Sequence, residues 1–255
     1  LLVYDLTKSR NRAETQAFYD REFKALDDLQ ATQVVAAIKD PFIWSEDFRI
    51  LPIVPPQGQI LATIPPAESS AELADELRRA SSCFETLHII HSKQVIHRAL
   101  TPAAIVMQGT GAQQKAIFTN FFAARIEEQS IALQLDLLEL TDPYAHPALA
   151  ASYGQANRAT DQYSLALIFL ERVSRQAVAD LRRDTRALPN LYTRWSNAPQ
   201  QVIQELTELF DSLLNGDIAQ PRDARAVGTI FGDLATRLNP KNVSQPTEQL
   251  LDKRY

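Results

Sequence analysis

The spacing of apolar residues changes along the chain, and its first part alternates between strand-like and helix-like patterns. Residues 1–6 are apolar around a central Tyr4 and predict a strand, and residues 34–38 and 48–54 predict two more. Residues 12–30 carry apolar side chains at a spacing of three to four without a proline, which predicts a helix. This part of the sequence therefore predicts a small lobe in which strands accompany one helix.

Helical spacing dominates the rest of the chain. Residues 67–93 place apolar side chains on one face of a helix, and a serine pair near its start supplies possible caps. Residues 163–173 are strongly apolar and predict a buried helix. Two amphipathic segments predict further helices over residues 202–214 and 224–238.

Two shorter patterns interrupt the helices. Apolar residues 105–107 and 115–118 flank Gly109 and Gly111, which predicts a hairpin whose turn uses the freedom of glycine at positive φ. A phosphate-binding loop is the disfavoured reading, because no third glycine follows in phase. An alternating stretch predicts a strand that could offer its edge to another chain or pack on its own lobe, the second being favoured: Ile131, Leu133, Leu135 and Leu137.

Proline pairs divide the sequence into parts. Pro55-Pro56 and Pro65-Pro66 bracket residues 55–66, which predict an extended and irregular connection. We therefore expect a small first lobe over residues 1–54 and a larger second lobe over residues 67–238. The polar, proline-punctuated residues 239–255 predict a tail or linker.

Composition narrows the function classes. The 255 residues are 45% hydrophobic and carry a net charge of -5, which argues against broad binding to nucleic acid or to anionic membranes. No run of about 18 apolar residues predicts a membrane span, and no signal peptide opens the sequence. The single cysteine, Cys83, cannot form an internal disulfide and suits a reducing cytoplasm. His88 and His91 have a possible metal spacing, but no ligand pattern completes a site, so no metal is expected.

One phrase resembles the catalytic loop of protein kinases, His-Arg-Asp-Leu-Lys-Pro-x-Asn. Residues 97–104 read His-Arg-Ala-Leu-Thr-Pro-Ala-Ala, so His97 and Arg98 match the family pattern. Ala99 stands where the family has its base aspartate, Thr101 where it has lysine, and Ala104 where it has the metal-binding asparagine. Alanine can neither accept a proton nor bind a metal, so the resemblance implies the loop without its chemistry.

A second phrase resembles the Asp-Phe-Gly segment of the same family. Asn120 stands at the position of the magnesium-holding aspartate, Phe121 keeps the apolar residue, and Phe122 replaces glycine. An amide is a poorer ligand for a hard cation than a carboxylate. The resemblance therefore implies that no magnesium ion is held here, although Glu127, Glu128 or Asp136 could in principle substitute as ligands.

The first lobe resembles the family from its third strand onward. Glu22 falls where the family glutamate pairs with a strand lysine, and the favoured register puts Leu2 at the lysine position. We expect Glu22 to lack its usual partner, since Lys8 is too far along; a solvated helix glutamate is the alternative. Leu26, together with Phe121 and His97, is implied to form a stacked core between the lobes.

The second lobe adds two points of resemblance. Asp161 lies in Thr-Asp-Gln-Tyr-Ser-Leu-Ala and is implied to bind backbone amides of the loop at 97–104; a helix N-cap is the alternative. Ala148 and Gln220 stand where the family has a buried glutamate–arginine ion pair. Both halves are absent together, as expected because one half left alone costs about 3–5 kcal/mol.

Together these phrases imply an α+β, bilobal protein kinase-like fold with a truncated, β-rich small lobe and a mainly helical large lobe. The implied function is a pseudokinase: a domain that binds a protein partner or neighbouring domains of the same chain and transfers no phosphate. ATP binding is not expected, and no magnesium is expected. The alternatives are a nucleotide sensor without turnover and an atypical, still active phosphotransferase. The segment 120–144 and the cleft near Ile53 are the expected partner surfaces. Richness in Ala, Gln and Leu suggests a bacterial protein. The resemblance begins at the third strand of the family and so implies a domain of a larger protein.

Overall fold

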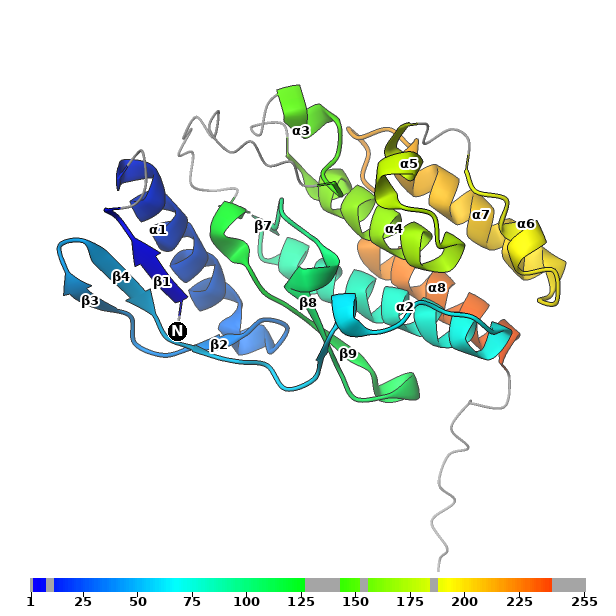
Figure 1. Cartoon of the computed structure of the whole chain (residues 1–255), viewed down its shortest axis with the longest axis horizontal. Coiled ribbons are helices and arrows are strands. Elements are labelled where there is room, and N and C mark those ends of the chain that lie inside the picture. The colour runs from blue at the N-terminus through cyan, green and yellow to red at the C-terminus, as the bar shows by residue number, and fades with distance from the viewer. Residues whose placement is uncertain (1, 8–11, 127–142, 152–155, 184–187, 240–255) are drawn as a thin grey trace, which may run out of the picture.

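The computed structural model describes residues 2–7, 12–126, 143–151, 156–183 and 188–239. Its chain is a mixture of helices and small antiparallel sheets (Figure 1). The residues Ile131, Leu133, Leu135 and Leu137, the proposed substitute ligands at 127, 128 and 136, and Lys8 lie outside the described ranges. So do residues 240–255 of the expected tail.

A three-stranded sheet and one helix form the first part of the chain. The helix α1 (Arg12–Leu29) has the position that its apolar spacing predicts, and it packs against two strands of the sheet. The sheet is antiparallel in the order β1-β4-β3, with Leu2 opposite Leu51. Its strands are β1 (Leu2–Asp5), β3 (Phe42–Ser45) and β4 (Phe48–Leu51).

The predicted strands of this part needed correction. The run 48–54 is broken at Pro52, because proline cannot donate to a ladder, and its end pairs separately as β5 (Ile53–Val54) with β2 (Ala37–Ile38). Of the predicted strand 34–38, only the last two residues are strand. Residues 42–45 were not predicted to be a strand and pair with β4.

The connection at 55–66 is more regular than predicted. It contains β6 (Gln59–Ile60), which joins the hairpin of β8 (Ile105–Gln108) and β9 (Lys115–Phe118) in the order β6-β8-β9. A turn of 3₁₀ helix, η2 (Leu61–Thr63), follows. The hairpin prediction is confirmed, and Gly109 and Gly111 have φ of +70° and +59°. The last residues of the connection lead into the longest helix, α2 (Ser70–Ser92), whose capping box at Ser69 confirms the predicted cap.

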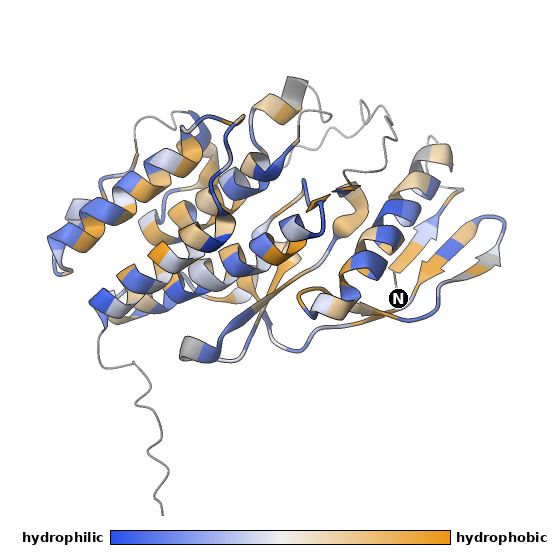
Figure 2. Ribbon diagram, turned by 180° about the vertical axis from the view of Figure 1, so that it is seen from behind, coloured by the Kyte–Doolittle hydropathy of each residue, from blue (hydrophilic) through white to orange (hydrophobic). Residues whose placement is uncertain are grey.

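Helices make up most of the second part, and the predicted ones are present. Figure 2 shows that they carry hydrophobic and hydrophilic residues side by side, as amphipathic helices do when one face is buried. The long helices are α2, α4 (Arg158–Ser174), α7 (Gln200–Leu214) and α8 (Ala224–Leu238), and the short ones are α3 (Ala148–Ala151), α5 (Val178–Arg183) and α6 (Leu191–Arg194). None of the helices in the described part of the chain combines the length and apolarity needed to cross a membrane.

Helices α2 and α8 approach closely because α8 presents glycines at the contact. A Cβ added to Gly228 would lie 3.0 Å from the carbonyl oxygen of Ser81, and one added to Gly232 would lie 3.2 Å from the Ser81 Oγ. Phe84 of α2 also stacks on Phe231 of α8, with 5.4 Å between ring centroids. The small residues therefore set the spacing of the two helices, and the aromatic pair fills the space beside them.

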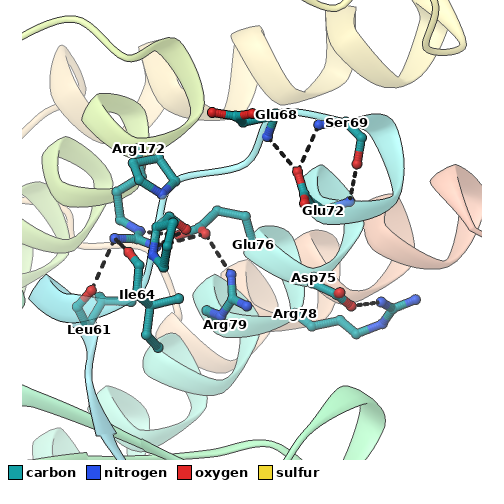
Figure 3. Close-up of polar contacts among 12 residues, drawn as sticks. Leu61, Ile64, Glu68, Ser69, Glu72, Asp75, Glu76, Arg78, Arg79 and Arg172 are labelled. Carbon is teal, nitrogen blue, oxygen red and sulfur yellow. Dashed lines mark hydrogen bonds and ion pairs between the residues drawn. The ribbon is translucent and has the colours of Figure 1, made fainter.

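A buried arginine fastens the connection at 55–66 to the helices (Figure 3). All five N–H groups of the Arg172 guanidinium are used: two donate to the carboxylate of Glu76, and three donate to carbonyl oxygens of Leu61, Ile64 and Pro65. Glu76 is fully buried and also accepts from Arg79 at 2.7 Å. The end of the connection is thus held to α2 and α4.

Helix α2 also completes the hydrogen bonding of strand β9. The Ser82 Oγ accepts from the backbone N–H of Ala116 at 2.8 Å, and the Thr86 hydroxyl donates to the Ala116 carbonyl at 2.9 Å. Both side chains are buried and lie one turn apart on α2. The helix therefore satisfies both backbone groups that Ala116 turns away from β8.

Candidate functional site

The loop at 97–104 follows the short strand β7 (Val95–Ile96) and is held by one carboxylate of α4. The backbone N–H groups of His97 and Arg98 donate to the two oxygens of Asp161, each at 2.8 Å, and His91 Nε2 lies 2.9 Å from Oδ2. Burial opposes ionisation of Asp161, but the hydrogen bonds and the nearby histidines hold its pKa below the usual value. The contact implied for Asp161 is therefore present, while the N-cap alternative is wrong, because Asn157 caps α4.

His97, the first residue of this loop, is fully buried. Its Nε2 lies 2.8 Å from the carbonyl oxygen of Thr119, and the backbone N–H of Ala99 points to Nδ1 at 3.4 Å. Burial lowers the pKa of His97, so the ring is neutral near pH 7 and carries its proton on Nε2. The imidazole is thus a structural link to the segment after β9.

The positions that would carry chemistry hold small or neutral side chains. Ala99 and Ala104 are buried, Thr101 is half-buried, and Asn120 is exposed. Asn120 has φ of +65°, a left-handed conformation that asparagine adopts more readily than most residues. Within the described ranges, no three His, Cys, Asp or Glu side chains gather into a group that could hold a metal ion.

Glu22 is buried and has a hydrogen-bond partner that the sequence did not predict. Glu22 is 3% exposed, so the solvated alternative is wrong. The hydroxyl of Tyr4 donates to its Oε2, and the backbone N–H of Phe121 donates to its Oε1 at 3.0 Å. Tyr4 lies two residues from Leu2 on the same face of β1, so the side-chain donor to Glu22 is a neutral hydroxyl.

Burial sets the ionisation of this pair. It raises the pKa of Glu22, and the two hydrogen bonds act in the opposite direction without cancelling it. Burial and the neighbouring carboxylate also raise the pKa of Tyr4. The tyrosine therefore stays protonated as the donor, and the pair contains no positive charge.

The segment after Asn120 packs on α1. Phe121 is fully buried in the same hydrophobic core as Leu26, and its ring lies 4.5 Å from that of His97 between centroids. Phe122 meets Phe18 of α1 edge to face, with 5.8 Å between centroids. The structure thus places Phe121 against His97 and in the same core as Leu26, and the bulky residue at 122 adds a contact with the helix.

The two positions implied for an ion pair lie in different surroundings. Ala148 is half-buried at the start of α3, and its backbone N–H donates to His146 Nδ1 at 3.0 Å. Gln220 is exposed in the loop between α7 and α8.

Sequence reasoning missed two polar residues. The sequence pattern presents Tyr4 only as the central residue of an apolar strand, and Arg172 lies within the apolar run that predicts α4. A signal for each existed: a polar group within an apolar stretch needs a partner when it is buried.

Comparisons with known proteins do not assign the chain to a family. No family model matches the chain, and no curated protein matches it.

Proposed function

We propose that this chain is a pseudokinase-type domain, with a two-lobed kinase-like architecture, that serves as a scaffold for a protein partner or for neighbouring domains. The observation that carries the proposal is the buried pair of Glu22 and Tyr4. In the family that the sequence resembles, this glutamate holds a lysine that contacts nucleotide phosphates. Here both of its oxygens are occupied by neutral donors.

The other positions of the proposed cleft support the same conclusion. Phosphoryl transfer depends on positive charge around the phosphates, on metal ligands and on a positioned base. Ala99 and Ala104 provide neither a base nor a ligand. Asn120 offers only an amide. Loss of a general base alone costs about 10²–10⁴ in rate, and the further losses remove the means of stabilising the transferring group.

Buried polar contacts still hold the loop at 97–104 and the segment at Phe121 in defined positions, which favours a scaffold role for the domain. Asp161 holds two backbone amides of the loop, and Glu22 joins α1 to Phe121. These groups are expensive to bury unless they are paired. A domain whose only requirement is a defined surface needs such contacts and does not need the catalytic groups.

Nucleotide binding and transfer test the proposal directly. We expect neither ATP nor ATP with Mg²⁺ to raise the melting temperature of the chain, and no label to pass from γ-labelled ATP to the chain or to casein. A matched control carries Tyr4→Lys, Ala99→Asp, Ala104→Asn and Asn120→Asp, and should gain metal-dependent stabilisation by ATP. Metal-dependent labelling by the unaltered chain would refute the proposal.

Other outcomes separate the alternatives. Stabilisation by ATP without transfer would indicate a nucleotide sensor. A control variant that folds but does not respond to ATP would argue against the kinase-like register itself. Cross-linking mass spectrometry in the source cell supplies the positive arm, since a scaffold predicts reproducible cross-links to another polypeptide or to neighbouring segments.

A further inference from the structure

A cavity opens between the start of α4, the end of α7 and the loop that leads to α8. Its volume is about 280 Å³, close to the lower end of the range of ligand pockets, about 300–1,000 Å³. None of the residues 97–104 lines the cavity. The side chains that matter to the argument are His146, Ala159, Gln162, Asp217 and Arg222.

Gln162 provides a buried acceptor at this cavity. The residue is only 3% exposed, and its Nε2 donates to the carbonyl oxygen of Arg222 at 2.6 Å, which fixes the orientation of the amide. The Oε1 atom accepts no hydrogen bond from the described residues, yet it is not among their sealed, unsatisfied atoms. Because Gln162 lines the cavity and this oxygen is not sealed, a ligand in the cavity could donate to it.

His146 provides a donor at the same cavity. Its Nδ1 accepts the backbone N–H of Ala148 at 3.0 Å, so that nitrogen carries no proton. Burial lowers the pKa of His146, which keeps the ring neutral and puts its single proton on Nε2. Within the described part of the chain, no acceptor meets that N–H group. The ring is held edge-on against Tyr163, 4.7 Å between centroids, so its direction is fixed.

An acceptor and a donor together favour a neutral ligand that can both donate and accept a hydrogen bond. A carboxylate would place an oxygen against the Gln162 Oε1, and an ammonium group would face the His146 N–H, so each charged group leaves one partner unmatched. A carboxamide offers both an N–H and a carbonyl oxygen. The exposed mouth carries one charge of each sign, Asp217 and Arg222, and so favours no net charge.

We infer that the cavity between α4 and α7 is a binding site for a neutral carboxamide, whose N–H donates to Gln162 and whose carbonyl accepts from His146. The carboxamide is that of glutamine or asparagine, either as the free amino acid or as a side chain of a polypeptide. The inference does not rest on the proposed pseudokinase function, because none of Glu22, Ala99, Ala104 and Asn120 lines the cavity.

NMR titration of the ¹⁵N-labelled chain tests the inference. The probes are N-acetyl-L-glutamine methylamide and free L-glutamine, with N-acetyl-L-leucine methylamide as the control that keeps both backbone amides and lacks the side-chain primary amide. We expect saturable shifts of the Gly216 and Ala219 backbone signals and of the Gln162 side-chain signal, with a dissociation constant of about 1–10 mM, as such small probes allow. Tighter binding of the blocked probe indicates a polypeptide source, and tighter binding of free glutamine indicates the amino acid.

Three variants make the result specific. Gln162→Leu removes the acceptor and should weaken binding by about three- to tenfold. Ala159→Leu fills the cavity while keeping a good helix former, and should abolish binding even if Gln162→Leu fails to fold. Gln204→Leu, the same substitution on an exposed position of α7, should change nothing. No saturable shift by either amide up to about 100 mM, equal shifts with the leucine probe, or binding that survives in Ala159→Leu would overturn the inference.

Discussion

Replacing Arg172 with methionine should strongly destabilise the protein. The change removes a buried guanidinium and leaves the fully buried carboxylate of Glu76 with only Arg79 as a charged partner. Removing one partner of a buried ion pair costs about 3–5 kcal/mol. Three carbonyl oxygens of the connection at 55–66 also lose their donors, though these can turn to water. We therefore expect a loss within that range.

The loss can be measured by urea unfolding at 25 °C and by calorimetry. For a chain of this size, about 1 kcal/mol corresponds to roughly 2–4 °C, so the melting temperature should fall by roughly 6–20 °C. The matched control is Arg183→Met, whose partner Asp180 is exposed and 3.1 Å away. That exposed pair should contribute less than about 1 kcal/mol.

The double variant decides whether the charge itself is responsible. With Glu76→Met added to Arg172→Met, no unpaired carboxylate remains, so the double variant should be more stable than Arg172→Met alone. Hydrogen exchange should also rise at the amides of Leu61 and Ile64, because their segment loses its anchor. The reasoning fails if Arg172→Met costs no more than Arg183→Met, or if the two substitutions at 76 and 172 are additive.

Two further predictions concern the buried Glu22 and the contact between α2 and α8. Burial raises the pKa of Glu22 in the folded chain above the unfolded value of about 4.3. The free energy of unfolding, measured relative to that of Glu22→Gln, should therefore increase as pH falls through the raised pKa. It should level off below about pH 4. Tyr4→Phe removes a donor that lowers this pKa, so the rise should begin at higher pH, with a cost of about 1–3 kcal/mol at pH 7 in urea unfolding. The methyl group of Gly228→Ala would lie against the backbone of Ser81 and should lower the free energy of unfolding by about 1–3 kcal/mol. The methyl group of Gly232→Ala meets the rotatable hydroxyl of Ser81, so this variant should gain up to about 1 kcal/mol in the free energy of unfolding. Equal melting temperatures for the two alanine variants would contradict this prediction.

The long helices could be predicted because each buries one face over several turns, and many residues repeat the same signal. Strands of two to four residues give too little alternation to recognise. Residues 42–45 were missed for that reason, and the run 48–54 concealed the break that Pro52 makes. Element boundaries in the small sheets depend on pairing between distant residues, which periodicity does not report.

The candidate site was predictable where a motif fixed a residue and its partner. The contact of Asp161 with the backbone at 97–98 followed from the resemblance, although the residues lie more than 60 positions apart. The partner of Glu22 did not follow, because a shift of two residues along β1 keeps the same side of the strand and fits an apolar pattern equally well. The position of Arg172 within an apolar run indicated that it needs a partner, but only the fold brings the carbonyl oxygens of Leu61 and Ile64 to its guanidinium.

The support that Ser82 and Thr86 give to Ala116 has a consequence for self-association. An outer strand with free amides and carbonyls can recruit a strand from another molecule, which is a common route to aggregation. At Ala116 both groups are already engaged by a helix that lies across the strand. Another molecule approaching this side would meet two hydroxyl-bearing side chains where it needs an open ladder, so β9 is protected there without a charged or proline residue.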